Sequence, residues 1–251
     1  MPQLSVVIIT YNEEHNLGRC LASVKRVADD MVVLDSFSTD RTEAIAKDHG
    51  ARFFQHIFDG HIEQKNRAIM HAMHPWVLSL DADEALSPEL EASILAAKQR
   101  SDADGFTMNR LTNYCGTWIK HGGWYPDRKL RLWDSRKGRW GGVNPHDKYE
   151  MDADARIVHL QGDLLHYSYN SLSDHIKQVD YFTTISAKQL HARGKQGGVL
   201  KILFSPVAKF IGMYVIGLGF LDGPHGYTIA RISAFATYLK YAKLRQLHRQ
   251  R

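Results

Sequence analysis

Residues 4–14 read LSVVIITYNEE, an apolar, largely β-branched run that passes directly into a polar turn. A short segment that is apolar at nearly every position is typical of a parallel strand buried on both faces. Further strand-like and helical segments then alternate along the chain. The expected strands are 31–34, 51–57 and 76–80, and the expected helices start near residues 17, 40, 62 and 88. This alternation predicts an α/β fold with a doubly wound, mostly parallel sheet flanked by helices.

The composition sets limits on the class of protein. The chain has 251 residues, of which 44% are hydrophobic and 24% charged, so one large catalytic domain with a sizeable core is expected. The net charge of +5 is spread along the sequence, which suits an anionic substrate or a membrane surface better than a nucleic acid. The two cysteines, Cys20 and Cys115, have no metal-ligand spacing. Without a signal-peptide pattern after Met1, we expect a cytoplasmic protein.

The second half of the chain has a different character. From about Phe106 the sequence is rich in aromatic residues and glycine, which predicts a loop-rich region, and a helical pattern returns at 172–192. A glycine-containing stretch at 194–198 precedes an apolar C-terminal region, residues 199–251, that we expect to be helical. Because Lys201 and Lys209 interrupt its apolar run, we expect this region to lie on a membrane without crossing it.

Polar side chains follow three of the expected strands. Residues 10–13, TYNE, come after the first strand, Asp35 after the second and residues 81–83, DAD, after the fourth. The carboxyl ends of parallel strands meet at one crevice, so these side chains are expected to converge there. Asp81 and Asp83 offer oxygen ligands suited to Mg²⁺ or Mn²⁺, with substrate phosphates completing the coordination.

These motifs resemble those of the family 2 glycosyltransferases, which have a GT-A fold. The matching segments are 5–14, SVVIITYNEE, then 33–40, VLDSFSTD, and 78–84, LSLDADE. The resemblance covers residues 4 to about 95. One departure is that many members have two aspartates and a glycine where this chain has Asp35, Ser36 and Phe37, which leaves the nucleoside contact to Asp35 alone.

The resemblance implies an inverting, metal-dependent transfer of a sugar from a nucleotide diphosphate donor. Residues 1–198 would form the catalytic domain, with a nucleotide-sugar-binding half at 1–105 and an acceptor half at 106–198. Asp81 and Asp83 would bind the metal. The implied donor-binding residues are Thr10, Tyr11, Asn12, Glu13, Asp35, Lys65 and Asp81.

A narrower resemblance is to the bacterial lipopolysaccharide core glucosyltransferases that modify inner-core heptose. It is carried by segments 58–60, FDG, and 64–66, QKN, by 118–127, WIKHGGWYPD, and by 219–223, GFLDG. It implies transfer of glucose from a UDP-sugar to a lipopolysaccharide core or other lipid-linked acceptor. Such an enzyme would be peripheral to the cytoplasmic face of the inner membrane and would contact its anionic surface.

An inverting transfer needs a base that deprotonates the acceptor hydroxyl. The resemblance places that base in segment 144–148, NPHDK, so Asp147 is the candidate, with Glu150 and Asp127 as alternatives. Trp118, Trp124 and Tyr125 are interpreted either as sugar-stacking residues or as core. The basic residues expected at acceptor phosphates are Lys120, Arg128 and Arg131. The other histidines lack ligand spacing and are interpreted as structural or surface residues.

The sequence does not favour other classes of nucleotide-binding enzyme. A dinucleotide-dependent enzyme needs glycines in the turn after the first strand, where this chain has TYNEE, and no P-loop sequence occurs. Two alternatives stay open: a polyprenyl-phosphate or capsule glycosyltransferase, and a catalytically silent nucleotide-sugar-binding protein. Neither the donor sugar nor the acceptor follows from residue spacing.

Overall fold

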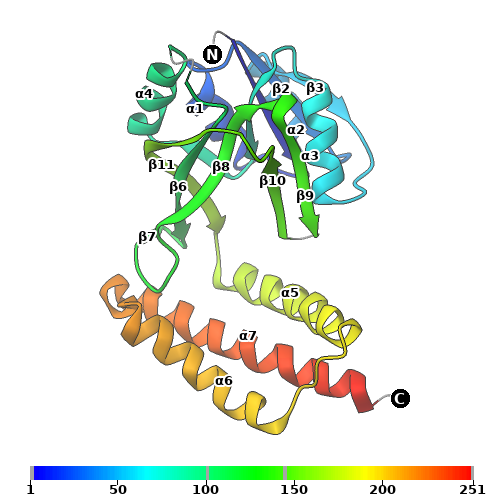
Figure 1. Ribbon diagram of the computed structural model, residues 1–251, viewed down its shortest axis with the longest axis vertical. Coiled ribbons are helices and arrows are strands. Elements are labelled where there is room, and N and C mark those ends of the chain that lie inside the picture. Colours follow the sequence, from blue (N-terminus) through cyan, green and yellow to red (C-terminus); the bar gives the residue numbers. More distant parts are fainter. Residues whose placement is uncertain (1–2, 100–101, 144–145, 250–251) are drawn as a thin grey trace. The chain divides into compact units, whose positions relative to one another are not determined.

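The computed structural model describes residues 3–99, 102–143 and 146–249, and the chain forms two compact units (Figure 1). The first unit comprises residues 1–110 and 127–167, and the second comprises 111–126 and 168–251. These boundaries differ from the expected divisions at 105 and 198, because the aromatic-rich region contributes to both units. The functional division into donor, acceptor and C-terminal regions stays a prediction.

The main sheet begins with the expected parallel strands. They are β1 (Leu4–Thr10), β2 (Asp30–Asp35), β3 (Arg52–Gln55) and β4 (Trp76–Asp81), in the spatial order β3-β2-β1-β4. All three pairings between them are parallel. The short α/β connections that the sequence pattern predicted therefore produce a parallel half-sheet, as expected from alternating strands and helices.

The other half of the sheet is antiparallel where it continues from β4. It contains β8 (Asp127–Asp134), β6 (Gly105–Tyr114), β11 (Ile157–Tyr169) and β5 (Glu84–Leu86), in the order β4-β8-β6-β11-β5. The pairs β4–β8, β6–β8 and β5–β11 are antiparallel, and β7 (Thr117–Ile119) pairs antiparallel with β6. The sheet is therefore mixed rather than mostly parallel, because these strands are not joined by the helical crossovers that parallel pairs require.

Helices cover both faces of the sheet in the first unit, as the doubly wound prediction requires. Helices α1 (Leu17–Val24), α2 (Thr42–Asp48) and α4 (Pro88–Ala97) contribute to one core together with Val6 and Ile8. Helix α3 (His61–Met70) contributes to the opposite core, which contains Val7 of the same strand. The alternation of side chains along β1 thus serves two cores.

A separate hairpin packs on the α3 side of the sheet. It consists of β9 (Gly138–Val143) and β10 (His146–Met151), which pair so that Asp147 lies opposite Gly142 and Tyr149 opposite Trp140. Tyr149 stacks on Trp133 of β8 with ring centroids 3.7 Å apart, and Trp140 meets the same ring edge-on at 5.5 Å. Two tryptophans of the aromatic-rich region therefore belong to the core.

The second unit is mainly helical. Helix α5 (Leu172–Ala192) has the bounds that the sequence predicted, and α6 (Val199–Ile211) continues into a π-helical turn, Gly212–Ile216. A 3₁₀ turn, Gly219–Asp222, leads into the long helix α7 (Gly223–Arg249). Helix α7 packs against both α5 and α6. A Cβ on Gly226 would lie 1.8 Å from the backbone oxygen of Gly219, so this close approach requires glycine.

The helical run Val199–Ile216 bears on the expectation that the C-terminal region lies on a membrane without crossing it. It has a mean hydropathy of 1.7 and is long and apolar enough to cross a membrane, by the criteria of length and composition alone. Only 6% of this run is buried inside the protein. Lys201 and Lys209 therefore do not by themselves exclude a span, and attachment without crossing stays a prediction.

Candidate active site at the ends of the parallel strands

The parallel register brings the expected polar segments together. Thr10 at the end of β1 lies beside Asp35 at the end of β2, and Ile9 lies beside Asp81 at the end of β4. The hydroxyl of Thr10 donates a 2.9 Å hydrogen bond to Oδ1 of Asp35. The predicted convergence of these strand ends is therefore observed in the first unit.

Hydrogen bonds join the loops that follow β1 and β2. The backbone N–H of Asn12 donates to Oγ of Ser38 at 2.7 Å, and the Asn12 side-chain oxygen accepts from the backbone of Thr39 at 2.9 Å. The backbone N–H of Glu13 donates to Oγ1 of Thr42 at 2.8 Å. Asn12 has a φ of 54°, a left-handed conformation that asparagine tolerates better than most residues. The two loops, residues 11–16 and 36–41, therefore form one ordered rim at the ends of β1 and β2.

Asp35 organises this rim from a buried position. Its carboxylate is 0% exposed and accepts hydrogen bonds from Thr10 and from the backbone of Ser38. Phe37 has a φ of 62°, a left-handed conformation that favours glycine. Tyr11 is 61% exposed. The direct contacts of Thr10, Tyr11, Asn12, Glu13 and Asp35 with a donor stay predictions.

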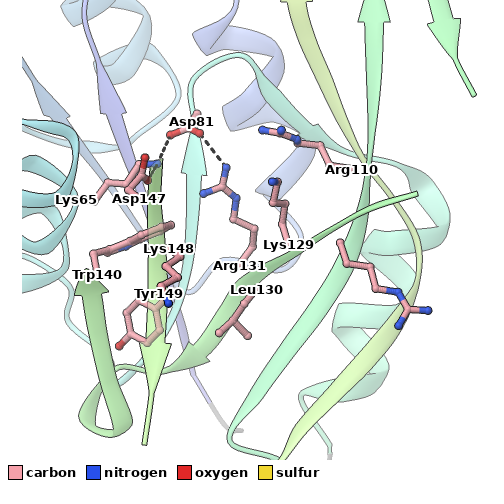
Figure 2. Close-up of a pocket in the computed structure, with 11 residues that line it drawn as sticks. Lys65, Asp81, Arg110, Lys129, Leu130, Arg131, Trp140, Asp147, Lys148 and Tyr149 are labelled. Carbon is pink, nitrogen blue, oxygen red and sulfur yellow. Dashed lines mark hydrogen bonds and ion pairs between the residues drawn. The ribbon is translucent and has the colours of Figure 1, made fainter. Parts of the chain in front are cut away.

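Asp81 lies at the centre of a network of charged side chains in the first unit (Figure 2). Its Oδ1 is 3.0 Å from Nζ of Lys65, and its Oδ2 is 2.8 Å from a guanidinium nitrogen of Arg131. Lys65 also pairs with Oδ2 of Asp147 at 2.8 Å. The structure therefore brings together the donor candidate Lys65, the metal candidate Asp81 and the base candidate Asp147.

The network continues on the other side of Asp81 through residues that sequence reasoning missed. Glu84, which is 1% exposed, accepts from Arg131 at 2.7 Å and from the backbone of Asp81 at 3.0 Å. Arg110 lies 3.7 Å from Glu84 and pairs with Asp127 at 2.8 Å, and Lys129 pairs with Asp127 at 3.0 Å. Two features of the sequence could have indicated these residues. Glu84 directly follows the DAD motif, and β8 carries charged residues at alternate positions, which point to the same face of the sheet.

The pKa shifts in the network follow from these ion pairs. Burial alone would raise the pKa of Asp81, but Lys65 and Arg131 outweigh it and hold that pKa well below its ordinary value. Burial likewise opposes the charge of Arg131, while Glu84 and Asp81 raise its pKa above the ordinary value. In the rim, burial raises the pKa of Glu13, although a hydrogen bond from Asn16 acts in the opposite direction. Asp81 is therefore ionised at neutral pH.

Asp83 has a partner of a different kind. Its Oδ2 lies 3.2 Å from Nε2 of His166, a residue of β11 that is held beside Glu84 in the strand register. The remaining histidines were interpreted as structural or surface residues. Strand pairing brings one of them, His166, to the DAD motif from 83 positions away, and its role stays a prediction. Within the described ranges there is no group of three or more His, Cys, Asp or Glu that could hold a metal ion.

These residues fit a divalent ion only if the ion takes part of its coordination from a ligand. Both oxygens of Asp81 are engaged by cations, whereas Asp83 and His166 offer one oxygen and one nitrogen side by side. Mg²⁺ and Mn²⁺ are normally held by protein carboxylates together with substrate phosphates and water, whereas imidazole is a common ligand of other divalent ions such as Zn²⁺ and Fe²⁺. The donor set therefore suits an ion that binds with a diphosphate.

A pocket of about 490 Å³ opens beside this network, and Asp81, Trp140 and Asp147 are among the residues that line it. Six of the lining residues are cationic: Lys65, Arg110, Arg128, Lys129, Arg131 and Lys148. The Trp140 ring lies beneath two of these cations, with its centroid 4.5 Å from Nζ of Lys65. A pocket with this excess of positive charge is suited to a phosphorylated ligand.

Among the base candidates, Asp147 lines the pocket with its side chain 14% exposed. Glu150 instead pairs with Lys148 on the surface, and Asp127 is shared by Arg110 and Lys129. Residues 144–145 of the NPHDK segment lie outside the described residues. The geometry therefore favours Asp147 over its alternatives, and its role stays a prediction.

The expected acceptor residues fall into two groups. Arg128 and Arg131 line the pocket of the first unit, although Arg131 is only 5% exposed. Trp118, Lys120, Trp124 and Tyr125 belong to the second unit. There, Trp124 packs edge-on against Tyr114 in a hydrophobic core, and the backbone of Lys120 donates to Asp222 at 3.2 Å. The acceptor roles of all six residues stay predictions.

Comparison with known proteins gives consistent matches. The model of the family described as glycosyl transferase family 2 matches residues 5–152. An uncharacterized glycosyltransferase of Rickettsia typhi is 31% identical over 98% of this chain and 88% of its own length. The lipopolysaccharide core biosynthesis glycosyltransferase LpsC of Rhizobium meliloti is 30% identical over 98% of this chain and 93% of its own length.

Among solved structures, similarity is found to glucosyl-3-phosphoglycerate synthase from Mycobacterium tuberculosis, crystallised with Mn²⁺ and UDP. The match is 22% identical, with a TM-score of 0.38, and covers 45% of this chain and 44% of the synthase.

Proposed function

Because the chain belongs to glycosyl transferase family 2, we propose that it is a metal-dependent, inverting hexosyltransferase that moves glucose from UDP-glucose to a lipopolysaccharide core acceptor. The observation that carries the proposal is the grouping of Lys65, Asp81 and Asp147 beside a cationic pocket at the ends of the parallel strands. This arrangement combines a carboxylate base with cations for a diphosphate leaving group. The name of the LpsC relative supports the choice of acceptor class.

In this proposal the donor binds across the strand ends. The rim residues Thr10, Tyr11, Asn12, Glu13 and Asp35 hold the nucleoside, and the pocket cations face its diphosphate. Asp83, one of the two predicted metal ligands, and His166, whose side chains are 3.2 Å apart, would hold a divalent ion, while the other predicted ligand, Asp81, has both oxygens paired with cations. The ion supplies Lewis-acid neutralisation of the charge that develops on the leaving diphosphate. Asp81 contributes by holding Lys65 and Arg131 at the pocket wall.

Asp147 acts as the base in this proposal. An inverting transfer needs one carboxylate to accept the proton of the acceptor hydroxyl while the anomeric carbon develops positive charge. In the absence of a donor, Lys65 balances the charge of Asp147 at 2.8 Å. A bound diphosphate attracts the same ammonium group, which would leave the carboxylate more available for the proton.

We propose that the second unit attaches the protein to the cytoplasmic face of a membrane. From residue 168 to 251 the sequence has twelve Lys and Arg, three Asp and no Glu, whereas the whole chain carries only +5. Helix α6 adds exposed apolar side chains, including Leu200 at 71% and Phe204 at 64% exposure. Basic and apolar groups together favour attachment to an anionic lipid surface. The same apolar helix also suits a polyprenyl-phosphate acceptor, which makes a polyprenyl-phosphate glycosyltransferase the second candidate.

A panel of nucleotide sugars tests the proposal. Purified protein with Mn²⁺ or Mg²⁺ is mixed with each donor and with either lipid A-core or polyprenyl phosphate, and the released nucleotide diphosphate is measured. UDP release that requires lipid A-core, and that Asp147→Asn lowers, is expected. Transfer only to polyprenyl phosphate would support the second candidate. If no nucleotide sugar is turned over or bound, the protein is not a transferase of this kind.

A further inference from the structure

The β9–β10 hairpin, which carries Asp147, is not part of the main sheet. Within the residues that the structure describes, β9 and β10 form a two-stranded sheet of their own. Its position over the pocket therefore depends on side-chain contacts rather than on a continuous ladder of backbone hydrogen bonds. The residues that make those contacts control where the Asp147 carboxylate lies.

One polar residue forms a reciprocal bond with this hairpin. The side-chain amide of Asn66, on helix α3, donates to the backbone oxygen of Trp140 at 3.0 Å. The backbone N–H of Trp140 in turn donates to Oδ1 of Asn66, also at 3.0 Å. An asparagine side chain has one acceptor and two donor hydrogens, so it can pair with a strand residue much as a neighbouring strand would. Asn66 therefore fixes the backbone of β9 to α3.

The neighbouring helix residue contacts the other strand. Lys65 pairs with Asp147 of β10 at 2.8 Å and also lies 4.5 Å from the Trp140 ring centroid. Across the hairpin, Trp140 is in register with Tyr149, two positions from Asp147 on β10. Two consecutive residues of α3 thus hold both strands of the hairpin, one through the backbone and one through the carboxylate.

The aromatic contacts of the hairpin do not replace the Asn66 bond. Trp140 and Tyr149 pack on Trp133 over their ring faces and edges. Apolar contact is non-directional, and it tolerates small displacements of the packed groups that a pair of hydrogen bonds opposes. For a catalytic group, a displacement of about 1 Å can lower the rate by roughly 10²-fold.

We propose that Asn66 is a positioning residue for the base, which holds the β9–β10 hairpin on helix α3 so that Asp147 meets the acceptor hydroxyl. This role rests on the proposed function of Asp147. Asn66 touches neither substrate in this scheme and acts only through the hairpin. A purely structural role, in which Asn66 contributes to stability alone, makes a different prediction about how its effect combines with the loss of Asp147.

A double-mutant cycle separates the two roles. Asn66→Ala removes both hydrogen bonds, and Asp147→Asn removes the proton acceptor while keeping its shape. Turnover and donor KM are measured for wild type, both single variants and the double variant, with UDP affinity measured by calorimetry. Met70→Ala is the matched control, because Met70 lies on the same helix and is 83% exposed.

We expect Asn66→Ala to lower turnover about tenfold with donor KM and UDP affinity within about twofold of wild type. In the Asp147→Asn background, Asn66→Ala should lower turnover almost no further, because there is no longer a base to position. An equal loss in both backgrounds, or no loss in the wild-type background, would overturn the proposal. Met70→Ala should behave as wild type in either background.

Two further arms keep the outcome interpretable. If Asn66→Ala does not fold, Asn66→Asp takes its place, since it keeps the acceptor for the Trp140 N–H, loses the donor to the Trp140 oxygen and places a carboxylate oxygen beside that oxygen. The same non-additivity is expected. Failure of the proposed function appears separately: a fully active Asp147→Asn single variant refutes the base, and the positioning role of Asn66 falls with it.

Discussion

Lys65 of helix α3 and Asp147 of strand β10 form an ion pair of 2.8 Å across 82 positions of the sequence. The lysine side chain is only 5% exposed and is shared with Asp81 at 3.0 Å. A single buried ammonium group therefore links the end of a parallel strand to the hairpin. Under the proposed function, donor binding and base availability therefore depend on the same side chain.

The first prediction concerns Asp147. Replacing it by asparagine keeps the shape of the side chain but removes the proton acceptor, so turnover should fall by roughly 10²-fold or more. UDP affinity should survive, because the pocket cations remain. Acceptor-dependent rate assays and calorimetry with UDP check the two halves of this expectation. A normal rate would transfer the role of base to Glu150 or Asp127.

A second prediction concerns the proposed metal ligand Asp83. Asp83→Asn should abolish metal-stimulated transfer while leaving the thermal midpoint close to that of wild type, since Asp83 pairs only with His166 among the ion pairs observed in the described part of the chain. Binding of Mn²⁺ in the presence of UDP, followed by electron paramagnetic resonance, gives a readout independent of activity. Full activity of this variant in excess chelator would show that no metal is needed.

Asp81→Asn should behave differently from Asp83→Asn. Asp81 is paired with both Lys65 and Arg131, whose side chains are 5% and 6% exposed. Lys65 keeps Asp147 and Arg131 keeps Glu84 as partners, so the loss of Asp81 leaves the two cations only partly compensated, at a cost below the about 3–5 kcal/mol of a fully broken buried ion pair. We therefore expect a lower free energy of unfolding in denaturant titrations, together with lost activity. Equal stability of the Asp81→Asn and Asp83→Asn variants would contradict the central place of Asp81 in the network.

The pH dependence of stability should contain a contribution from His175 in the second unit. Burial lowers the pKa of His175 to about 4, and its Nδ1 lies 2.9 Å from the hydroxyl of Tyr114. Between pH 6.5 and 4 the unfolded chain binds more protons at this residue than the folded protein does. Stability is therefore lost as the pH falls through this window, by at most about 3 kcal/mol. Unfolding of wild type and His175→Gln between pH 7 and 4 should show a shallower loss in the variant; parallel curves would exclude this contribution.

Membrane attachment is best tested in the whole chain of 251 residues. Deleting residues 199–251 would remove α7, against which α5 packs, so substitutions on the exposed face of α6 are preferable. The double variant Leu200→Glu, Phe204→Glu should lose most of its flotation with anionic liposomes at low salt. Met70→Glu, a change in the first unit at a side chain that is at least as exposed, should float like wild type. High salt should release part of the wild-type protein; equal flotation of all three would exclude this face.

Sequence reasoning was most successful where local pattern decides structure. The strands that end at Thr10, Asp35 and Asp81 have period and composition signals of their own, and parallel pairing then brings their ends together. Helix α5 was predictable for the same reason. The resemblance added Lys65 and Asp147, which no local pattern would have selected.

The features that could not be predicted from the sequence depend on contacts between distant segments. Arg131 reaches Asp81 across 50 positions, and His166 reaches Asp83 through the pairing of β11 with β5. The antiparallel half of the sheet was missed because its strands lack the regular alternation with helices. For Trp124 the sequence allowed both stacking on a sugar and packing in a core, and the structure shows core contacts with Tyr114.

The first unit is interrupted in the sequence by residues 111–126, and this affects how the genes of such proteins can recombine. Residues 111–126 leave that unit and bury Tyr114 and Ile119 in one core with Ile229 and Ala230 of α7, which lie more than a hundred positions later. A crossover between two genes that replaces only one of these blocks would combine side chains selected in different parents. Descendants that fold are expected to exchange both blocks or to compensate in the shared core, so the second unit should behave in recombination as two linked pieces rather than as a detachable C-terminal module.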